Sequence, residues 1–277
     1  MAWQPCVSGL DKAARSFTRI CNMRYQIELA YEGTHFGGWQ VQNNTITVQG
    51  EIDKALSQVC NQTIETMGCG RTDAGVHASY FVAHFDGPEN IPIDLDIRLN
   101  KMLPNSIGIK KITAVNEDFH ARFSATRREY HYHIHRSKNP FTANTSWWLG
   151  TELNVAAMNQ CAVAIIGKHP FQAFCKGEIP NGNPMCEVFI AEWTITEAGY
   201  TFQIQANRFL RNMVRALVGT MVEVGQGKIS PANFEAIFMG GSRSEAGASA
   251  PAQGLHLTDV KYPKGNPKAS AESNPVG

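Results

Sequence analysis

The stretch GCGRTDAGVHASYFVAHFDG, residues 68–87, decides how the first half of the chain folds. It begins with a loop of small residues that carries one arginine, one aspartate and one histidine. It continues into an apolar run, residues 79–87, that is typical of a strand. A second strand is expected near residues 63–69, just before the loop. Because glycines allow a tight turn, we expect the loop to present its few functional side chains at the mouth of a cleft.

Asp73 is the first candidate for chemistry in this loop. Arg71 lies two residues before it, and a cation within ~4–6 Å lowers the pKa of a carboxyl group by roughly 1–3 units. A carboxylate that stays charged suits a nucleophile. The alternative is an Asx-turn, in which Asp73 only bonds backbone N–H groups, and the spacing alone favours neither. His77 either contacts a phosphate or, as is commoner, caps the next element.

Strand and helix patterns follow one another along the chain without strict alternation. This mixture favours an α+β fold, with helices packed against antiparallel or mixed sheets. Asn154 is expected to cap a helix, and Ala198–Gly199 to turn a hairpin. Two similar halves of this kind would form a groove between their sheets. Helices are expected at residues 47–61, 94–104, 153–167, 212–227 and 230–241, and further strands at 24–33, 106–115, 128–137, 187–199, 200–209 and 254–262.

The chain has 277 residues, which suits two cores, since single cores stop growing near ~250–300 residues. We expect an N-terminal domain at residues 23–122, which holds the glycine-rich loop, and a C-terminal domain at residues 123–262. Residues 1–22 lack the apolar block of a signal peptide and are expected to be an extension. Residues 263–277 are rich in Pro, Gly and Ser and are expected to be a disordered tail.

Composition and missing motifs narrow the functional classes. The seven cysteines are odd in number, widely spaced and without a C-x-x-C pair, which predicts free thiols in a cytoplasmic protein. No apolar run approaches the ~18 residues of a membrane span. Phosphate-loop, dinucleotide, zinc-protease and serine-hydrolase motifs are all missing from the sequence. We therefore expect a reaction centred on one aspartate, with no cofactor and no metal.

Basic residues gather in two places, although the net charge is only +1. Residues 122–138 carry Arg and Lys side chains opposed by a single glutamate, and residues 208–215 carry arginines with no acid among them. Arg211 and Arg215 would lie one turn apart on the expected helix and are candidates for phosphate contact, although a solvated helix face is the alternative. Aromatic residues interleaved with these cations fit RNA better than duplex DNA.

The strand expected at residues 128–137 has a distinct residue type on each face. Tyrosine and isoleucine alternate with histidine there, so the two faces carry Tyr130, Tyr132 and Ile134 on one side and His131, His133 and His135 on the other. Three histidines suggest a metal, but no carboxylate or cysteine flanks them in chelating register, so a solvated face is the better explanation. Tyr130 would stack on a base if it faces a cleft, although a lone tyrosine is more often core.

Three longer blocks occur in the order found in one known family: GRTDAGVHA, then DFHARFSATRREYHY, then NRFLRNMVRALVGTMVEVG with a late GLHL strand. From Arg24 to Tyr262 the chain resembles the tRNA pseudouridine synthase A family. The resemblance implies two domains of ferredoxin-like, RRM-like topology with the active site in the cleft between them. It implies isomerisation of uridine to pseudouridine at positions 38, 39 and 40 of the tRNA anticodon stem-loop. No cofactor is implied, and the enzyme would be a homodimer whose two subunits hold one tRNA.

The resemblance also assigns roles at matching positions. Asp73 would be the catalytic aspartate, and Tyr130 would contact the target base. Arg71 would lie near the acid and the RNA, and Arg215 would pair with the aspartate. The carboxylate would form an adduct at the sugar C1′, deprotonate C2′ to give a glycal, or attack C6 of the uracil. Arg211 replaces a less charged residue of the family, which leaves open only how the RNA is gripped.

Two other functions remain open from the sequence. A non-catalytic RNA-binding module would use the same halves and basic patches, but it does not explain an acid inside an RNA cleft. A glycosidase-like hydrolase needs a second carboxylate ~5–10 Å from the first. Only Asp86 and Glu89 are candidates for it, if the fold brings them back toward Asp73.

Overall fold

The computed structural model describes residues 22–263. The extension expected at residues 1–22 and the tail expected at residues 263–277 lie almost entirely outside the described residues. Across residues 22–263, no helix combines the length and the apolar character that crossing a membrane requires.

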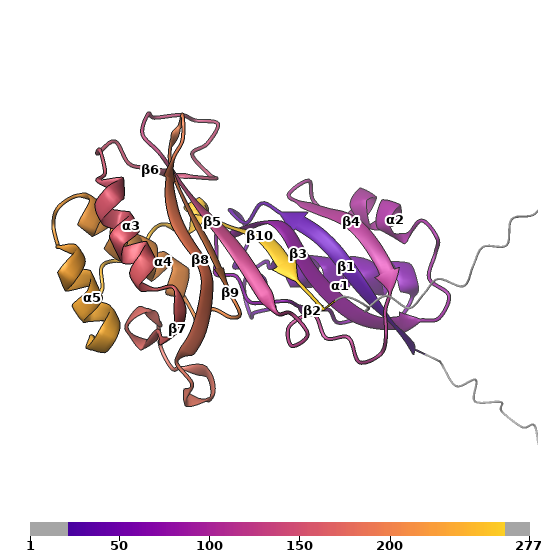
Figure 1. The fold of residues 1–277 in the computed structure, drawn as a ribbon. Coiled ribbons are helices and arrows are strands. Elements are labelled where there is room, and N and C mark those ends of the chain that lie inside the picture. The colour runs from indigo at the N-terminus through magenta and orange to yellow at the C-terminus, as the bar shows by residue number, and fades with distance from the viewer. Residues whose placement is uncertain (1–21, 264–277) are drawn as a thin grey trace, which may run out of the picture.

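Ten strands within the described residues form one mixed sheet (Figure 1). Eight of them follow the order β4-β1-β3-β10-β5-β9-β8-β7, while β2 pairs with β3 and β6 pairs with β5. β3 pairs in parallel with β10, and β5 with β6; the other pairs are antiparallel. The strands are β1 (Asn22–Tyr31), β2 (Met67–Gly68), β3 (His77–Pro88), β4 (Ile107–Ala114), β5 (Arg127–His135), β6 (Trp147–Trp148), β7 (Gly167–Pro170), β8 (Met185–Ile195), β9 (Gly199–Ala206) and β10 (Leu255–Lys261).

Between residues 22 and 263, five α-helices lie at the two ends of this sheet (Figure 1). The N-terminal strands are covered by α1 (Val48–Cys60) and α2 (Leu95–Met102). The C-terminal strands are covered by α3 (Val155–Ala164), α4 (Met213–Gly225) and α5 (Pro231–Gly240). The side chains of Thr47, Asn154 and Ser230 accept hydrogen bonds from backbone N–H groups at the starts of α1, α3 and α5. The cap expected at Asn154 is thereby confirmed.

One row of paired residues connects the two apolar cores across the sheet. Paired residues on neighbouring strands face the same side, so the row can be followed from strand to strand. Its N-terminal members belong to the core under α1 and α2, and its C-terminal members to the core under α3, α4 and α5. Tyr130, in the middle, packs against both cores. The row consists of Tyr31, Ala78, Leu257, Tyr130, Ile204 and Ala191.

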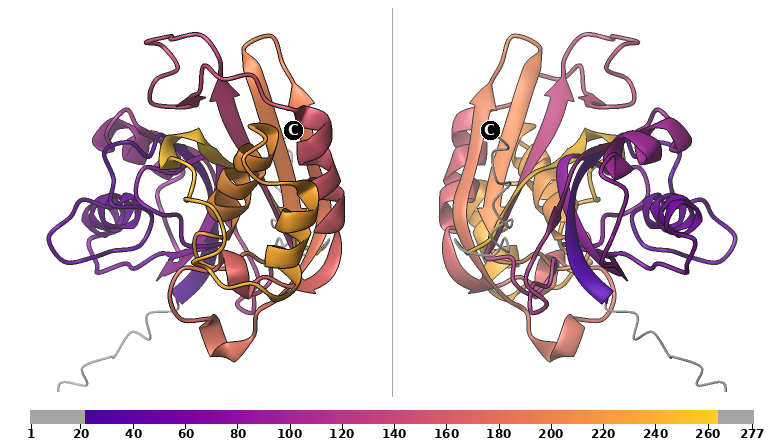
Figure 2. Two further views of the ribbon diagram at one scale, coloured as in Figure 1. Left: turned by 90° about the vertical axis from the view of Figure 1, so that its left-hand side faces the viewer. Right: turned by 90° about the vertical axis from the view of Figure 1, so that its right-hand side faces the viewer.

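The continuous sheet corrects the expectation of a groove between two separate sheets. β10, the last strand, pairs with β3 from the first half and with β5 from the second. Neighbouring strands are rotated against each other by roughly 20–25°, and this twist accumulates along the sheet. The two helix groups lie at opposite ends of the sheet (Figure 1), and Figure 2 shows the sheet from its two ends. The central strands β3, β10 and β5 lie between the two groups.

Most of the elements expected from the sequence are confirmed within a few residues. The hairpin at Ala198–Gly199 joins β8 to β9 as expected. The short strands β6 and β7 were not indicated by any apolar pattern, because each has only two to four residues. The strand expected at residues 63–69 is reduced to Met67–Gly68.

Helix α4 is buried on nearly all sides, and one glycine in it allows a close approach. A Cβ atom at Gly219 would lie 1.8 Å from the carbonyl oxygen of Ala248. The segment that passes there also holds Arg215, because Ala250 donates its N–H to the carbonyl oxygen of Arg215 at 2.9 Å and accepts from Nε of Arg215 at 2.8 Å. Gly219 thus sets the distance between α4 and the chain that positions Arg215.

Gly219→Ala is expected to lower the free energy of unfolding by about 1–3 kcal/mol, because the new methyl group collides with the backbone at Ala248. Gly240→Ala, at the end of α5, is the matched control, since nothing lies within 4 Å of its Cβ position. That variant should be neutral or more stable by up to about 1 kcal/mol. Urea unfolding of both proteins measures the difference. Equal stability of the two variants would contradict the close packing of α4.

Candidate active site

The loop that carries Asp73 is anchored at Thr72, between β2 and β3. The Thr72 hydroxyl lies 2.9 Å from the hydroxyl of Tyr31. The carbonyl oxygen of Thr72 accepts the N–H of Trp39 at 3.3 Å. Gly38 passes so close that a Cβ there would lie 2.4 Å from Thr72 O, and its φ of +98° is in the left-handed region. The turn-rich segment around Gly38 therefore fixes the backbone from which Asp73 projects.

Asp73 meets Arg215 from the opposite half of the molecule. An Nη1 nitrogen of Arg215 donates to Oδ2 of Asp73 at 3.3 Å, across 142 positions of sequence. The Asp73 side chain is 34% exposed and that of Arg215 is 21% exposed, so the pair is reachable from solvent. Among the described residues, no backbone N–H donates to the carboxylate, so the structure does not show the Asx-turn alternative. The pairing that the resemblance implied for Arg215 is present.

Arg71 occupies a different position from the one its spacing suggested. Its side chain is exposed and lines a small pocket with Arg122, and among the described residues the ion pair of Asp73 is with Arg215. The arginine nearest in sequence is therefore not the one that pairs with the acid.

Tyr130 lies at the junction of the two cores on β5. Its ring contacts Phe209 edge-on, with the ring centroids 5.2 Å apart. Burial raises the pKa of the Tyr130 hydroxyl, and the nearby Cys69 and Asp73 raise it further against the opposing effect of Arg128. The phenol is therefore protonated at neutral pH, and the negative charge of Asp73 contributes to its raised pKa.

His77 and Arg211 lie apart from this pair. His77 is 2% exposed, its Nδ1 accepts the N–H of Gly33 at 2.9 Å, and its ring stacks on His256 at 4.6 Å. Burial lowers the pKa of His77, so the ring is a neutral interior group. Arg211 is exposed, but it precedes α4 rather than lying on it. The expectation that Arg211 and Arg215 share a helix face is therefore wrong, because Asn212 takes a left-handed conformation before the helix starts at Met213.

Arg128 is a residue whose position the sequence did not reveal. Its guanidinium donates only to backbone carbonyl oxygens, which belong to three separate segments beside the site. Nη2 and Nε donate to the carbonyl oxygen of Cys69 at 2.9 Å and 3.1 Å, and Nη1 donates to that of Asn207 at 2.9 Å. Nη2 and Nη1 also reach the carbonyl oxygens of Arg122 at 2.6 Å and Ala125 at 3.4 Å. In the sequence Arg128 is one member of a basic run. No local sequence pattern indicates that its side chain bonds the backbone beside the loop that carries Asp73.

Other arginines gather around Arg128. The pKa of Arg122 is lowered by burial and by the nearby positive charges of Arg71, Arg128 and Arg208. Cations that repel one another in this way gain stability when an anion joins them. Arg208 of the second basic run therefore lies near Arg122 and Arg128 of the first.

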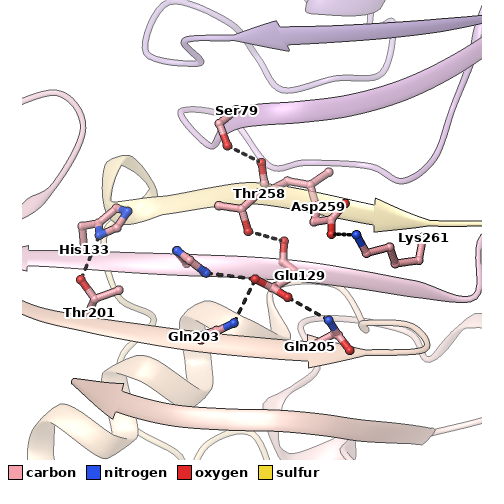
Figure 3. Close-up of polar contacts among 11 residues, drawn as sticks. Ser79, Glu129, His133, Thr201, Gln203, Gln205, Thr258, Asp259 and Lys261 are labelled. Atoms are coloured by element: carbon pink, nitrogen blue, oxygen red, sulfur yellow. Dashed lines mark hydrogen bonds and ion pairs between the residues drawn. The ribbon is translucent and has the colours of Figure 1, made fainter.

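The histidine-rich face of β5 carries a hydrogen-bonded polar network (Figure 3). Glu129 accepts from the side-chain amides of Gln203 at 3.0 Å and Gln205 at 2.8 Å, and lies 3.1 Å from Nε2 of His131. His133 lies 3.2 Å from the hydroxyl of Thr201. Between residues 22 and 263, no three His, Cys, Asp or Glu side chains are grouped so that they could hold a metal ion.

Comparison with known proteins connects this geometry to a family. The sequence profile of a family described as tRNA pseudouridine synthase matches residues 29–124 and 161–263. The chain belongs to this family. The match includes the loop that carries Asp73, Tyr130 is excluded from it by only a few residues, and Arg215 lies in its second part. The enzyme class that GRTDAGVHA suggested, an isomerase acting on tRNA, is confirmed.

Individual tRNA pseudouridine synthases are similar over most of their length. The chain is 45% identical over 246 residues to the tRNA pseudouridine synthase A of Bacteroides fragilis, covering 87% of this chain and 97% of the relative. It is 41% identical over 245 residues to that of Bacteroides thetaiotaomicron, covering 87% and 91%. It is 37% identical over 245 residues to that of Bacillus subtilis, covering 87% and 99%.

Arg128→Lys is expected to loosen the catalytic loop, because an ammonium group cannot reach all the carbonyl oxygens that the planar guanidinium bonds. The free energy of unfolding should fall by roughly 1–3 kcal/mol, and backbone amides of residues 69–76 should exchange hydrogen faster. Arg136→Lys, at an exposed position of the same basic run, is the control and should change neither. Hydrogen exchange by mass spectrometry measures the loop, and identical protection in both variants would refute the fastening role.

Proposed function

We propose that this chain isomerises uridine to pseudouridine at positions 38, 39 and 40 of the tRNA anticodon stem-loop, with Asp73 as the nucleophile. The observation that carries the proposal is the Asp73 carboxylate, one-third exposed and paired at 3.3 Å with Arg215 from the other half of the molecule. Membership of the tRNA pseudouridine synthase family supports the reaction. The proposed enzyme works in the cytoplasm as a homodimer that grips one tRNA.

The reaction requires little beyond a carboxylate and a firm hold on the base. The N1–C1′ bond breaks, the uracil turns, and a new bond joins C5 to C1′, while the proton leaves C5 and N1 gains one. No atom is lost and there is no net oxidation or reduction, so the balance needs no second reactant. The carboxylate of Asp73 would attack C1′, remove a proton from C2′, or attack C6, and all three routes need it ionised. Arg215 supplies the opposite charge and fixes its direction.

Tyr130 is proposed to receive the uracil after it leaves the stack. Extrusion of a base costs a few kcal/mol, which contacts in the pocket must offset. The ring of Tyr130 projects from the central strand β5 and contacts the ring of Phe209 edge-on. Because its pKa is raised, the hydroxyl donates hydrogen bonds at neutral pH, and the ring offers a stacking surface. Arg71 and Arg211, both exposed, are proposed to contact RNA phosphates, whereas the buried His77 supports the loop from beneath.

The two halves are proposed to be ferredoxin-like domains at residues 23–122 and 123–262. The separate apolar cores under the two helix groups support this division. β10 complicates it, because Leu257 and Val260 from the end of the chain pack in the N-terminal core. The proposed boundary therefore divides the helices between the two domains. It does not divide the strands as fully, because β10 from the second domain packs in the core of the first.

The rival functions have less support from the geometry. A hydrolase needs a second carboxylate near Asp73, but Asp86 lies toward the far end of β3 and is bound by Arg24 at 2.8 Å. Glu89 follows β3 immediately and lies at that same far end. A non-catalytic RNA-binding module does not explain the accessible Asp73 carboxylate, because a carboxylate repels the phosphates of RNA.

Asp73→Asn is expected to abolish pseudouridine formation, by roughly 10³-fold or more, because the amide cannot act as the nucleophile. The variant should fold and bind tRNA about as well as the unmodified protein. Asp118→Asn, an exposed carboxylate outside the site, is the control and should keep full turnover. Pseudouridine is measured by chemical labelling and reverse transcription of the product tRNA. Substantial turnover by Asp73→Asn would refute the nucleophile.

Tyr130→Phe is expected to lose far more turnover than tRNA affinity, because it removes the hydroxyl and keeps the stacking ring. Single-turnover rates at saturating enzyme and filter-binding Kd values separate the two effects. Equal losses in rate and affinity would show that the hydroxyl contributes to binding alone. Tyr80→Phe, which removes a hydroxyl elsewhere on β3, should behave like the unmodified enzyme.

A further inference from the structure

A small pocket opens beside the catalytic loop and is not used by the chemistry proposed for Asp73. Its volume is about 140 Å³, and it reaches the loop at Gly70 and Arg71, just before the acid. Gln49, His120, Arg122 and Phe123 line other parts of it. The volume is well below the ~300–1,000 Å³ of pockets that hold drug-sized ligands. It suits one planar group or one phosphate.

An aromatic ring stands exposed at the rim of this pocket. The Phe123 side chain is 76% exposed, which leaves most of its face to solvent. The His120 ring lies against it with centroids 4.3 Å apart, and the Arg122 guanidinium carbon lies 5.6 Å from the Phe123 centroid. An apolar ring that is exposed yet flanked by a cation and an imidazole resembles the platforms on which proteins stack single-stranded bases.

The ring is held in place by a tight turn rather than by a mobile loop. Nδ1 of His120 accepts the N–H groups of both Arg122 and Phe123 at 3.2 Å. The backbone N–H of Ser124 donates to the carbonyl oxygen of His120 at 2.8 Å, and the Ser124 hydroxyl accepts from His120 N–H at 3.0 Å. Arg128 bonds the carbonyl oxygen of Arg122 from below. A platform fixed in this way loses little conformational freedom when a base stacks on it.

The charge around the pocket is positive only. Arg71 and Arg122 both line it, and no aspartate or glutamate is among its lining residues. Burial and the neighbouring arginines lower the pKa of Arg122, so the cluster is short of negative partners within the described residues. A phosphodiester group would supply the missing charge, and two arginines can hold its two free oxygens.

We propose that this pocket is a second nucleotide subsite, which binds the nucleotide adjacent to the uridine that leaves the stack. Its phosphate lies between Arg71 and Arg122, and its base stacks on Phe123. The subsite thereby holds the strand open while the neighbouring uridine lies beside Asp73. This inference rests on the proposed function, since it assumes an RNA strand that passes the catalytic loop.

The test compares two exposed phenylalanines. Phe123→Ala should weaken binding of a target tRNA by roughly 5- to 100-fold, the loss expected for one stacked base. Phe141→Ala removes a ring that is 94% exposed and does not line the pocket, and it should leave the Kd unchanged. Phe123→Trp should restore binding, because an indole also stacks. Thermal unfolding of each variant confirms that the fold is kept.

A fluorescent base reports the stacking itself. The fluorescence of 2-aminopurine placed on either side of the target uridine in a stem-loop RNA should be quenched by the unmodified enzyme at one flank. The quenching should be lost with Phe123→Ala and kept with Phe141→Ala. If Phe123→Ala binds and quenches like Phe141→Ala while pseudouridine is still formed, the subsite is refuted and the proposed function stands. If the unmodified enzyme forms no pseudouridine, the proposed function fails, and the affinity and quenching comparison still decides on the subsite.

Discussion

The candidate active site depends on a carboxylate and a guanidinium that are 142 positions apart in the chain and 3.3 Å apart in space. Asp73 stands on a loop of the first half, and Arg215 on a helix of the second. Their contact requires the two halves to be held in one fixed relation, which a flexible connection could not provide. β10 provides it, because its backbone bonds β3 on one side and β5 on the other. The same strand places Tyr130 between the two cores.

The sequence was informative wherever local physics decides the structure. The alternation of residues 24–33, the helical spacing after Thr47 and the cap at Asn154 all correspond to observed elements. Asp73 was recognisable as a candidate because glycines surround an acid in a loop between strands. Pairing across the chain could not be predicted in this way. Spacing suggested Arg71 as the partner of the acid, and the resemblance alone pointed to Arg215, since no local pattern records which segments meet.

The arginines show most clearly what residue counting misses. Arg122 and Arg128 come from the same basic run, yet they have different tasks. Arg128 donates to carbonyl oxygens of three segments and is committed to the protein itself. Arg122 is repelled by the positive charges of neighbouring arginines and lines an open pocket. A nearly neutral protein can therefore present a locally positive site, because Arg71 and Arg122 line one pocket together.

The place of β10 in the order of the chain has a consequence for synthesis. The ribosome completes this strand last among all those in the sheet, although it lies near the middle of the sheet. Until it emerges, β3 and β5 have no common neighbour, and the acid and its arginine belong to two unconnected pieces. A nascent or prematurely terminated chain would thus lack the assembled centre, so only a finished polypeptide would be able to act on RNA.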